Sequence, residues 1–182
     1  INTVSKEDEA SIFFLENTIL NIDDISKLTT IPVIGIVGIK QTTSNLAVFE
    51  KQPDAVVVTV ADLERDGFGS NPLFQILVAE LDVEITGIAL FYNRYSTWKG
   101  KTIHLEDLIV SEKYRGSGIG MKLYEAVMRE AKSQNVRRVE WNVLDWNTPA
   151  ISFYEKTGAV VFKDWLVAQM DEERLINFLE NR

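Results

Sequence analysis

The sequence predicts a mixed α/β fold, of the α+β kind, in which helices pack on a mostly antiparallel sheet that contains one parallel pair of strands. Two β-rich runs, residues 73–81 and 85–95, are separated by a short acidic segment, which predicts an antiparallel hairpin. A third apolar run at 102–110 leads through a helical pattern at 118–133 to a strand pattern at 138–144. Strand, helix and strand in this order form a βαβ unit, so its two strands should be parallel.

The bulk composition is that of an ordered globular chain. The 182 residues, of which 46% are hydrophobic and 25% charged, can bury one core, so we expect a single domain over residues 1–182. The chain has no cysteine, which excludes disulfides, thiolate metal sites and a cysteine nucleophile. A single histidine makes a histidine-rich metal site or a serine–histidine relay hard to assemble, and we expect no metal.

Charge and hydropathy restrict the partners. No basic-then-apolar leader opens the sequence and no apolar run is long enough to span a bilayer, so we expect a cytoplasmic protein without a membrane partner. The net charge of -8 argues against a general nucleic-acid binder, whose affinity rests on lysine and arginine. It favours cationic partners, although many proteins are acidic for solubility alone.

The first third of the chain has weaker patterns. Residues 1–45 are atypical; we expect a strand near 18–22 and a helix between 32 and 49. The valines at 56–58 predict a short strand. Thr59 and the acid three residues later match the capping pattern of a helix start, and we expect that helix to end at Gly67.

Later elements have clearer signals. Gly87 within the second β-rich run indicates a bulge or a close backbone approach. The helix at 118–133 carries an apolar stripe with a spacing of four residues, formed by Ile119, Leu123, Val127 and Ala131. A proline near the start and a glycine after the end delimit a helix over 150–157. We expect a last strand at 160–170 and a short terminal helix.

The loop 115–120, RGSGIG, lies between a predicted strand and a long helix, where backbone N–H groups and the helix dipole form an anion site. Its three glycines would let the backbone approach a pyrophosphate, although a tight turn that needs positive φ explains them as well. A Walker A loop is excluded because Gly120 is followed by Met-Lys-Leu instead of Lys-Ser/Thr. A dinucleotide fingerprint has another glycine spacing and no antiparallel hairpin before it.

Together with the preceding strand, the segment LEDLIVSEKYRGSGIG at 105–120 resembles the acetyl-CoA motif of the GNAT acetyltransferase superfamily. The segments YSTWKG at 95–100, VLDWN at 143–147 and FY at 153–154 are similar to the diamine (spermidine/spermine) acetyltransferase branch, and most similar to its thialysine-acetylating relatives. The resemblance covers about residues 46–170. It implies a GNAT-like sheet with helices on both faces, a splayed parallel strand pair, acetyl-CoA as cofactor, a small cationic amine as substrate, and a homodimer.

The resemblance also implies the cofactor site. The backbone of the strand before the loop would pair with the pantetheine amides, the loop would hold the phosphates, and the start of a later helix would line the pantetheine. The residues are Leu108, Ile109 and Val110; Arg115, Gly116, Ser117, Gly118, Ile119, Gly120 and Met121; and Asn147, Thr148, Pro149, Ala150 and Tyr154.

Direct transfer to an amine needs a base, because an ammonium with a pKa of about 10.4 must lose a proton, which costs roughly 4 to 5 kcal/mol at pH 7. The resemblance implies that Glu106 is a water-relayed base and that Tyr154 is the acid that protonates the leaving thiolate. Alternatively, Glu106 and Asp107 form a surface acidic pair and Tyr154 packs in a helix. In a regular strand Asp107 would face away from Glu106 unless a bulge intervenes. We expect His104 to be a structural residue rather than the base.

On the acceptor side, the resemblance implies substrate contacts from Glu50, Ser96, Thr97, Glu106 and Asp107. Tyr95 and Trp98 would either wall an aminoalkyl chain or pack at an interface. Two other functions remain open: a non-catalytic acyl-CoA-binding or regulatory module, and a GNAT enzyme that acts on protein N-termini or aminoglycosides, because a cofactor motif does not specify the acceptor.

Overall fold

The computed structural model describes residues 11–14, 31–81 and 84–181. The chain divides into two compact units, residues 1–141 and 142–182. The first unit contains β1 (Ser11–Phe14), α2 (Ile31–Phe49), α3 (Val60–Phe68), β2 (Gln75–Leu81), β3 (Glu84–Ser96), β4 (Gly100–Val110), the 3₁₀ turn η2 (Glu112–Tyr114), α4 (Ile119–Ser133) and β5 (Val139–Glu140). The second contains α5 (Thr148–Lys156) and α6 (Glu172–Glu180).

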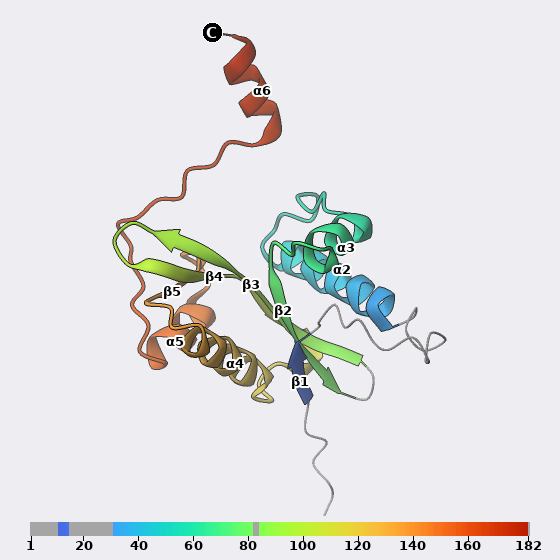
Figure 1. The fold of residues 1–182 in the computed structure, drawn as a ribbon. Helices are drawn as coiled ribbons and strands as arrows, with labels where there is room; N and C mark the ends of the chain where they lie inside the picture. The colour runs from blue at the N-terminus through green and yellow to red at the C-terminus, as the bar shows by residue number, and fades with distance from the viewer. Residues whose placement is uncertain (1–10, 15–30, 82–83, 182) are drawn as a thin grey trace, which may run out of the picture. The chain divides into compact units, whose positions relative to one another are not determined.

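The five strands form one sheet in the order β1-β2-β3-β4-β5 (Figure 1). The first three pairings are antiparallel and the last, between β4 and β5, is parallel. The β2–β3 pairing confirms the predicted hairpin, and the β4–β5 pairing confirms the βαβ pattern. The parallel ladder is very short and joins Ile103 to Val139 and His104 to Glu140. The Glu140 carboxylate lies 3.0 Å from Arg94 Nη1 on β3 and 3.0 Å from Arg138 Nη2, so β3 and β5 are linked where the ladder ends.

Helices cover both faces of this sheet (Figure 1). On one face, Ile39 of α2 packs with alternate residues of the strands, namely Ile76, Val78, Ile88, Leu90 and Ile109. On the other face lies α4, whose predicted apolar stripe is buried together with Tyr124. Gly87 points to this second face, next to the Leu123 side chain. The alternation of strand side chains therefore fills two separate apolar layers.

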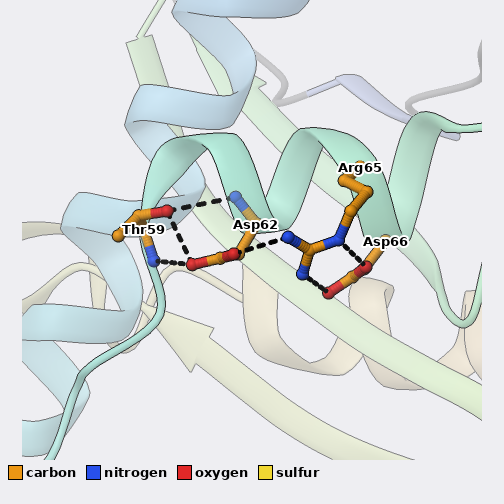
Figure 2. A network of polar contacts seen from close by, with 4 residues as sticks. All are labelled: Thr59, Asp62, Arg65 and Asp66. Carbon is orange, nitrogen blue, oxygen red and sulfur yellow. Dashed lines mark hydrogen bonds and ion pairs between the residues drawn. The ribbon is translucent and has the colours of Figure 1, made fainter.

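The capping pattern at the start of α3 is confirmed (Figure 2). The Thr59 hydroxyl accepts a hydrogen bond from the Asp62 N–H at 3.1 Å, and the Asp62 carboxylate accepts one from the Thr59 N–H at 3.0 Å. Arg65 joins this carboxylate to Asp66, with contacts of 2.8 and 2.7 Å. The network occupies the exposed side of the helix, where such pairs contribute little stability.

The predicted end of α3 at Gly67 is wrong, because the helix continues to Phe68 and its C-cap is Gly69. A Cβ at position 67 would lie 2.3 Å from the Phe74 ring. Gly67 therefore makes room for an aromatic side chain and does not terminate the helix.

Three strand predictions also need correction. Residues 56–58 and 160–170 form no strand, and the strand predicted at 138–144 is reduced to Val139–Glu140. Apolar β-branched runs form strands only where a neighbouring strand accepts their hydrogen bonds. Val57 and Leu166 are instead 83% and 94% exposed.

Other predictions are confirmed. The helix between 32 and 49 is α2, the helix at 150–157 is α5, and the terminal helix is α6. Gly158 follows α5 with φ of 91°, the left-handed conformation that a glycine after a helix end adopts. The strand expected near 18–22 lies outside the described residues. None of the helices in the described part of the chain is long and apolar enough to cross a membrane.

Candidate active site

The loop between β4 and α4 has the geometry of an anion site. Gly116 and Gly118 have φ of 81° and 87°, so both need glycine for conformation. Gly118 is the N-cap of α4 and provides no side-chain cap. The first backbone hydrogen bond of the helix runs from Lys122 N to Gly118 O, 3.1 Å. The N–H groups of residues 119–121 therefore have no acceptor within the helix, and they point outward at its positive end.

Space above the loop is open. A Cβ at Gly116 or Gly118 would meet no atom within 4 Å, and one at Gly120 would lie 3.5 Å from the Val110 side chain. The Ser117 hydroxyl donates to the Tyr114 carbonyl at 2.5 Å and so fixes the turn. These residues fit a pyrophosphate, because free N–H donors, the helix dipole and absent side chains occur together.

Arg115 joins this loop to the end of α2. Its Nε donates to the Val110 carbonyl at 3.2 Å, and its guanidinium lies 5.4 Å from the centroid of the Phe49 ring. The Nε of Arg115 thus binds the backbone at the end of β4, while the rest of the side chain remains exposed beside the loop. Glu50 follows Phe49 directly, so the cofactor loop and this acid belong to one region of the first unit.

The last residues of β4 have an open backbone edge. Leu108, Ile109 and Val110 pair with β3 on one side. On the other side the ladder with β5 ends at His104, and no strand of the described segments continues it. So short a ladder is what the splayed pair implied by the resemblance would leave, and the Val110 carbonyl already accepts the Arg115 Nε hydrogen bond.

A β-bulge places both acids of β4 at the site. Leu90 pairs with Asp107 and the next residue, Phe91, pairs with Leu105, so Glu106 is the extra residue. Asp107 therefore points to the face of Leu90 and is partly buried, while the Glu106 side chain is 53% exposed. The two acids do not face away from each other as they would in a regular strand.

Glu50, Glu106 and Asp107 form one electrostatic group, which we call the acidic cluster. Burial, followed by the charges of Glu106 and Glu50, raises the pKa of Asp107 to about 6. Burial also raises the pKa of Glu50. Neighbouring carboxylates repel one another, so the cluster is suited to a cationic ligand.

Ser96 and Thr97 lie elsewhere in the first unit. Ser96 pairs with Gly100 at the far end of the β3–β4 hairpin, and its hydroxyl accepts hydrogen bonds from the N–H groups of Trp98 and Lys99, both 3.2 Å. Ser96 lies six positions along β3 from Leu90, the partner of Asp107. In an extended strand this is a distance of about 20 Å. The unit does not bring these hydroxyls to the acidic cluster. Tyr95 and Trp98 are 76% and 81% exposed there.

The remaining expected residues belong to the second unit. The Asn147 side chain accepts a hydrogen bond from Ala150 N at 3.3 Å and caps α5, with Pro149 in the first turn. Tyr154 lies one turn later, and its ring is 5.3 Å from that of Phe153 in an edge-to-face contact. Thr148 begins the helix.

The sequence reasoning missed Tyr92. Its ring lies 5.3 Å from the His104 ring, and Glu106 raises its pKa both by charge and by hydrogen bonding, after the larger effect of burial. The hairpin predicted from residues 73–95 did not contain the signal, because Tyr92 pairs with His104 in the register of β3 with β4. Within the described segments, no group of three histidine or acidic side chains could hold a metal ion.

Residues 41–159 match the model of the acetyltransferase (GNAT) family. The chain belongs to this family. Its members use acetyl-CoA, and the chain is an N-acetyltransferase.

Several relatives within the family show which of its branches the chain resembles. The chain is 39% identical over 122 residues to a thialysine N-epsilon-acetyltransferase of Bos taurus, which covers 63% of this chain and 72% of that protein. It is 41% identical over 121 residues to an L-ornithine N5-acetyltransferase of Arabidopsis thaliana, covering 66% and 50%. It is 34% identical over 142 residues to a spermidine/spermine N(1)-acetyltransferase-like protein of Homo sapiens, covering 72% and 20%. The suspected branch of the family is thus confirmed.

Solved structures share the fold. An aminoglycoside N-acetyltransferase in complex with CoA superposes with a TM-score of 0.66 at 14% identity, over 92% of this chain and 99% of that one. At this identity the similarity concerns the fold, which is the mixed α/β fold of the GNAT family.

Proposed function

We propose that this chain transfers the acetyl group of acetyl-CoA directly to a primary amine of a small cationic substrate, which is a diamine, a polyamine or a thialysine- or lysine-like amino acid. The observation that carries the proposal is the acidic cluster, two of whose members lie on β4, the strand that leads into the anion loop. The names of the relatives, which concern thialysine, ornithine and polyamines, support the same class of acceptor.

The cofactor would be held by the first unit at three places. N–H groups of Gly116 to Met121 would bind the pyrophosphate, the exposed guanidinium of Arg115 would add charge, and the backbone of Leu108 to Val110 would pair with pantetheine amides. When bound, acetyl-CoA supplies an acetyl group activated as a thioester. In the second unit we assign Asn147 to Ala150 to the pantetheine side.

The acidic cluster would bind the ammonium group and then remove its proton. Glu106, the exposed member, takes the proton through a water molecule, while Asp107 and Glu50 retain the cation until then. The free amine would form the new N–C bond as the C–S bond of acetyl-CoA breaks, and the second proton would leave the nitrogen through the same water. We assign Tyr154 the role of holding a proton at its hydroxyl for the departing sulfur, since a phenol and a thiol have similar pKa values.

Amine turnover tests the proposal. CoA release is measured with the purified chain, acetyl-CoA and a panel of diamines, polyamines, ornithine, lysine and thialysine, together with N-terminal peptides and aminoglycosides as alternative acceptors. Turnover of the small amines above background is the expected result. Tight CoA binding without turnover of any acceptor would favour the binding-module function, and turnover confined to peptides or aminoglycosides would replace the acceptor class.

The Tyr154 assignment has its own test. Tyr154→Phe should lower kcat much more than it weakens acetyl-CoA binding, because the ring stays and only the acid is lost. Phe153 is a neighbour in the same helix, so Phe153→Leu serves as a control for packing. Equal kcat values for Tyr154→Phe and the parent would remove Tyr154 from the mechanism.

We further infer that both units belong to one acetyltransferase domain, since the family match runs across both. The proposed assembly is a homodimer in the cytoplasm that does not bind nucleic acid. The segment 160–170, with Phe162 and Trp165 69% and 73% exposed, is the part of the chain we expect to meet a second copy. Light scattering of the full chain tests the dimer, and a monomer at micromolar concentration would contradict it.

A further inference from the structure

The single histidine of the chain is buried beside the proposed base. His104 is only 7% exposed, and its Nε2 lies 3.6 Å from Glu106 Oε2. Its ring is tilted by 34° against the Tyr92 ring. The histidine is thus enclosed between an aromatic ring and a carboxylate on the same face of the sheet.

The other ring nitrogen indicates how the proton is placed. His104 Nδ1 is buried and has no hydrogen-bond partner among the described residues. A neutral imidazole has one N–H and one lone pair, and a buried N–H without an acceptor is less tolerable than an unpaired acceptor. We therefore assign the hydrogen to Nε2, directed at Glu106. In this tautomer Nε2 is a donor and cannot take a proton from Glu106.

Glu106 needs such a partner because of the bulge. As the extra residue of β4 it is not held by a regular cross-strand neighbour, and its side chain is 53% exposed. A free glutamate side chain samples many rotamers, and only some of them reach a bound amine. The Tyr92 hydroxyl hydrogen-bonds Glu106 from the neighbouring strand, while the 3.6 Å between His104 Nε2 and Glu106 Oε2 is a longer polar contact.

We propose that His104 is a positioning residue for Glu106: its Nε2–H, together with the Tyr92 hydroxyl, holds the Glu106 carboxylate in the direction of the bound amine. This inference rests on the proposed function, in which Glu106 is the base. In this role His104 acts on the Glu106 carboxylate and not on the substrate.

Two substitutions of His104 distinguish a role in positioning Glu106 from a role in packing. In His104→Gln the side-chain amide can replace the Nε2–H, while in His104→Asn it corresponds to Nδ1 and does not reach Glu106. We expect His104→Asn to lower kcat about tenfold, the size of a coupling between contacting residues, with the KM for acetyl-CoA unchanged. His104→Gln should keep most of the parent's kcat. Equal losses in both variants would overturn the proposal.

A double-mutant cycle with Glu106→Gln tests whether His104 acts through Glu106. If it does, His104→Asn should have almost no further effect on kcat in the Glu106→Gln background. Additive losses would overturn the proposal. If His104→Asn unfolds, Tyr92→Phe provides a second test, because it keeps the ring and removes only the hydroxyl. Its kcat should fall, and an unchanged kcat would contradict the proposed arrangement.

The two levels of failure can be told apart. A parent chain that acetylates no amine contradicts the proposed function. A parent that is active, loses rate in Glu106→Gln and keeps it in His104→Asn contradicts only the role of His104.

Discussion

Gly87 of β3 lies so close to Ile109 of β4 that a Cβ at position 87 would be 2.7 Å from the Ile109 carbonyl oxygen. It would also be 3.1 Å from the Leu123 side chain of α4. The sequence predicted a bulge or a close approach here, and the structure shows the close approach, next to the open end of β4.

Gly87→Ala should therefore destabilise the fold. The backbone oxygen cannot move without shifting β4, so we expect a loss of about 1 to 3 kcal/mol in the free energy of unfolding. Urea denaturation measures it. Gly120→Ala is the matched control, because its Cβ would make an ordinary 3.5 Å contact and alanine favours the helix. Equal stability of Gly87→Ala and the parent would contradict the close approach.

Asp107 should make stability depend on pH. Its pKa is raised from 3.8 to about 6 in the folded chain, so the folded state holds this proton more tightly than the unfolded state. The stabilisation that the protonated Asp107 gives to the folded state is then lost as pH rises from about 4 to 6. It stays lost above that range. Asp107→Asn should be more stable than the parent at pH 7.5 by about 1 to 3 kcal/mol, with little difference at pH 4. Urea denaturation at both pH values measures the difference, and a gain independent of pH would contradict it.

The same carboxyl should control amine binding. As pH falls through about 6, Asp107 takes up a proton and the acidic cluster loses one negative charge. We expect the KM for the amine to rise below pH 6 while the KM for acetyl-CoA changes less. In Asp107→Asn the amine KM should be higher at neutral pH, and this step near pH 6 should disappear. If the step persists in the variant, another group is responsible for it.

Arg115 should contribute to cofactor affinity. Its guanidinium is exposed at the anion loop, and hydrogen bonds to charged groups contribute about 1.5 to 3 kcal/mol. Arg115→Gln should weaken CoA binding at least tenfold by isothermal titration calorimetry, and the loss should shrink at high salt. Arg129→Gln, on the exposed side of α4, removes the same charge away from the loop and should have little effect. Equal effects of both variants would indicate general electrostatics alone.

Local signals in the sequence predicted local structure well. The capping pair Thr59 and Asp62 and the apolar stripe of α4 depend on residues three or four positions apart, and both are present as expected. The strand predicted at 160–170 failed because a strand requires a partner that the segment itself cannot specify. The site depends on the same kind of non-local information. The bulge at Glu106 results from the register of two strands, and the contact of His104 with Tyr92 follows from it. No pattern within residues 102–110 indicates either.

The bulge has a consequence beyond catalysis. A strand edge without a neighbour, like that of β4 beyond His104, is a template on which strands of other chains can assemble into aggregates. Bulges and inward-pointing charges are features that prevent such assembly, because they break the regular row of hydrogen-bonding groups and make added strands costly. Glu106 and Asp107 supply both features at this edge. The residues that we assign to amine binding should therefore also disfavour strand addition at this edge.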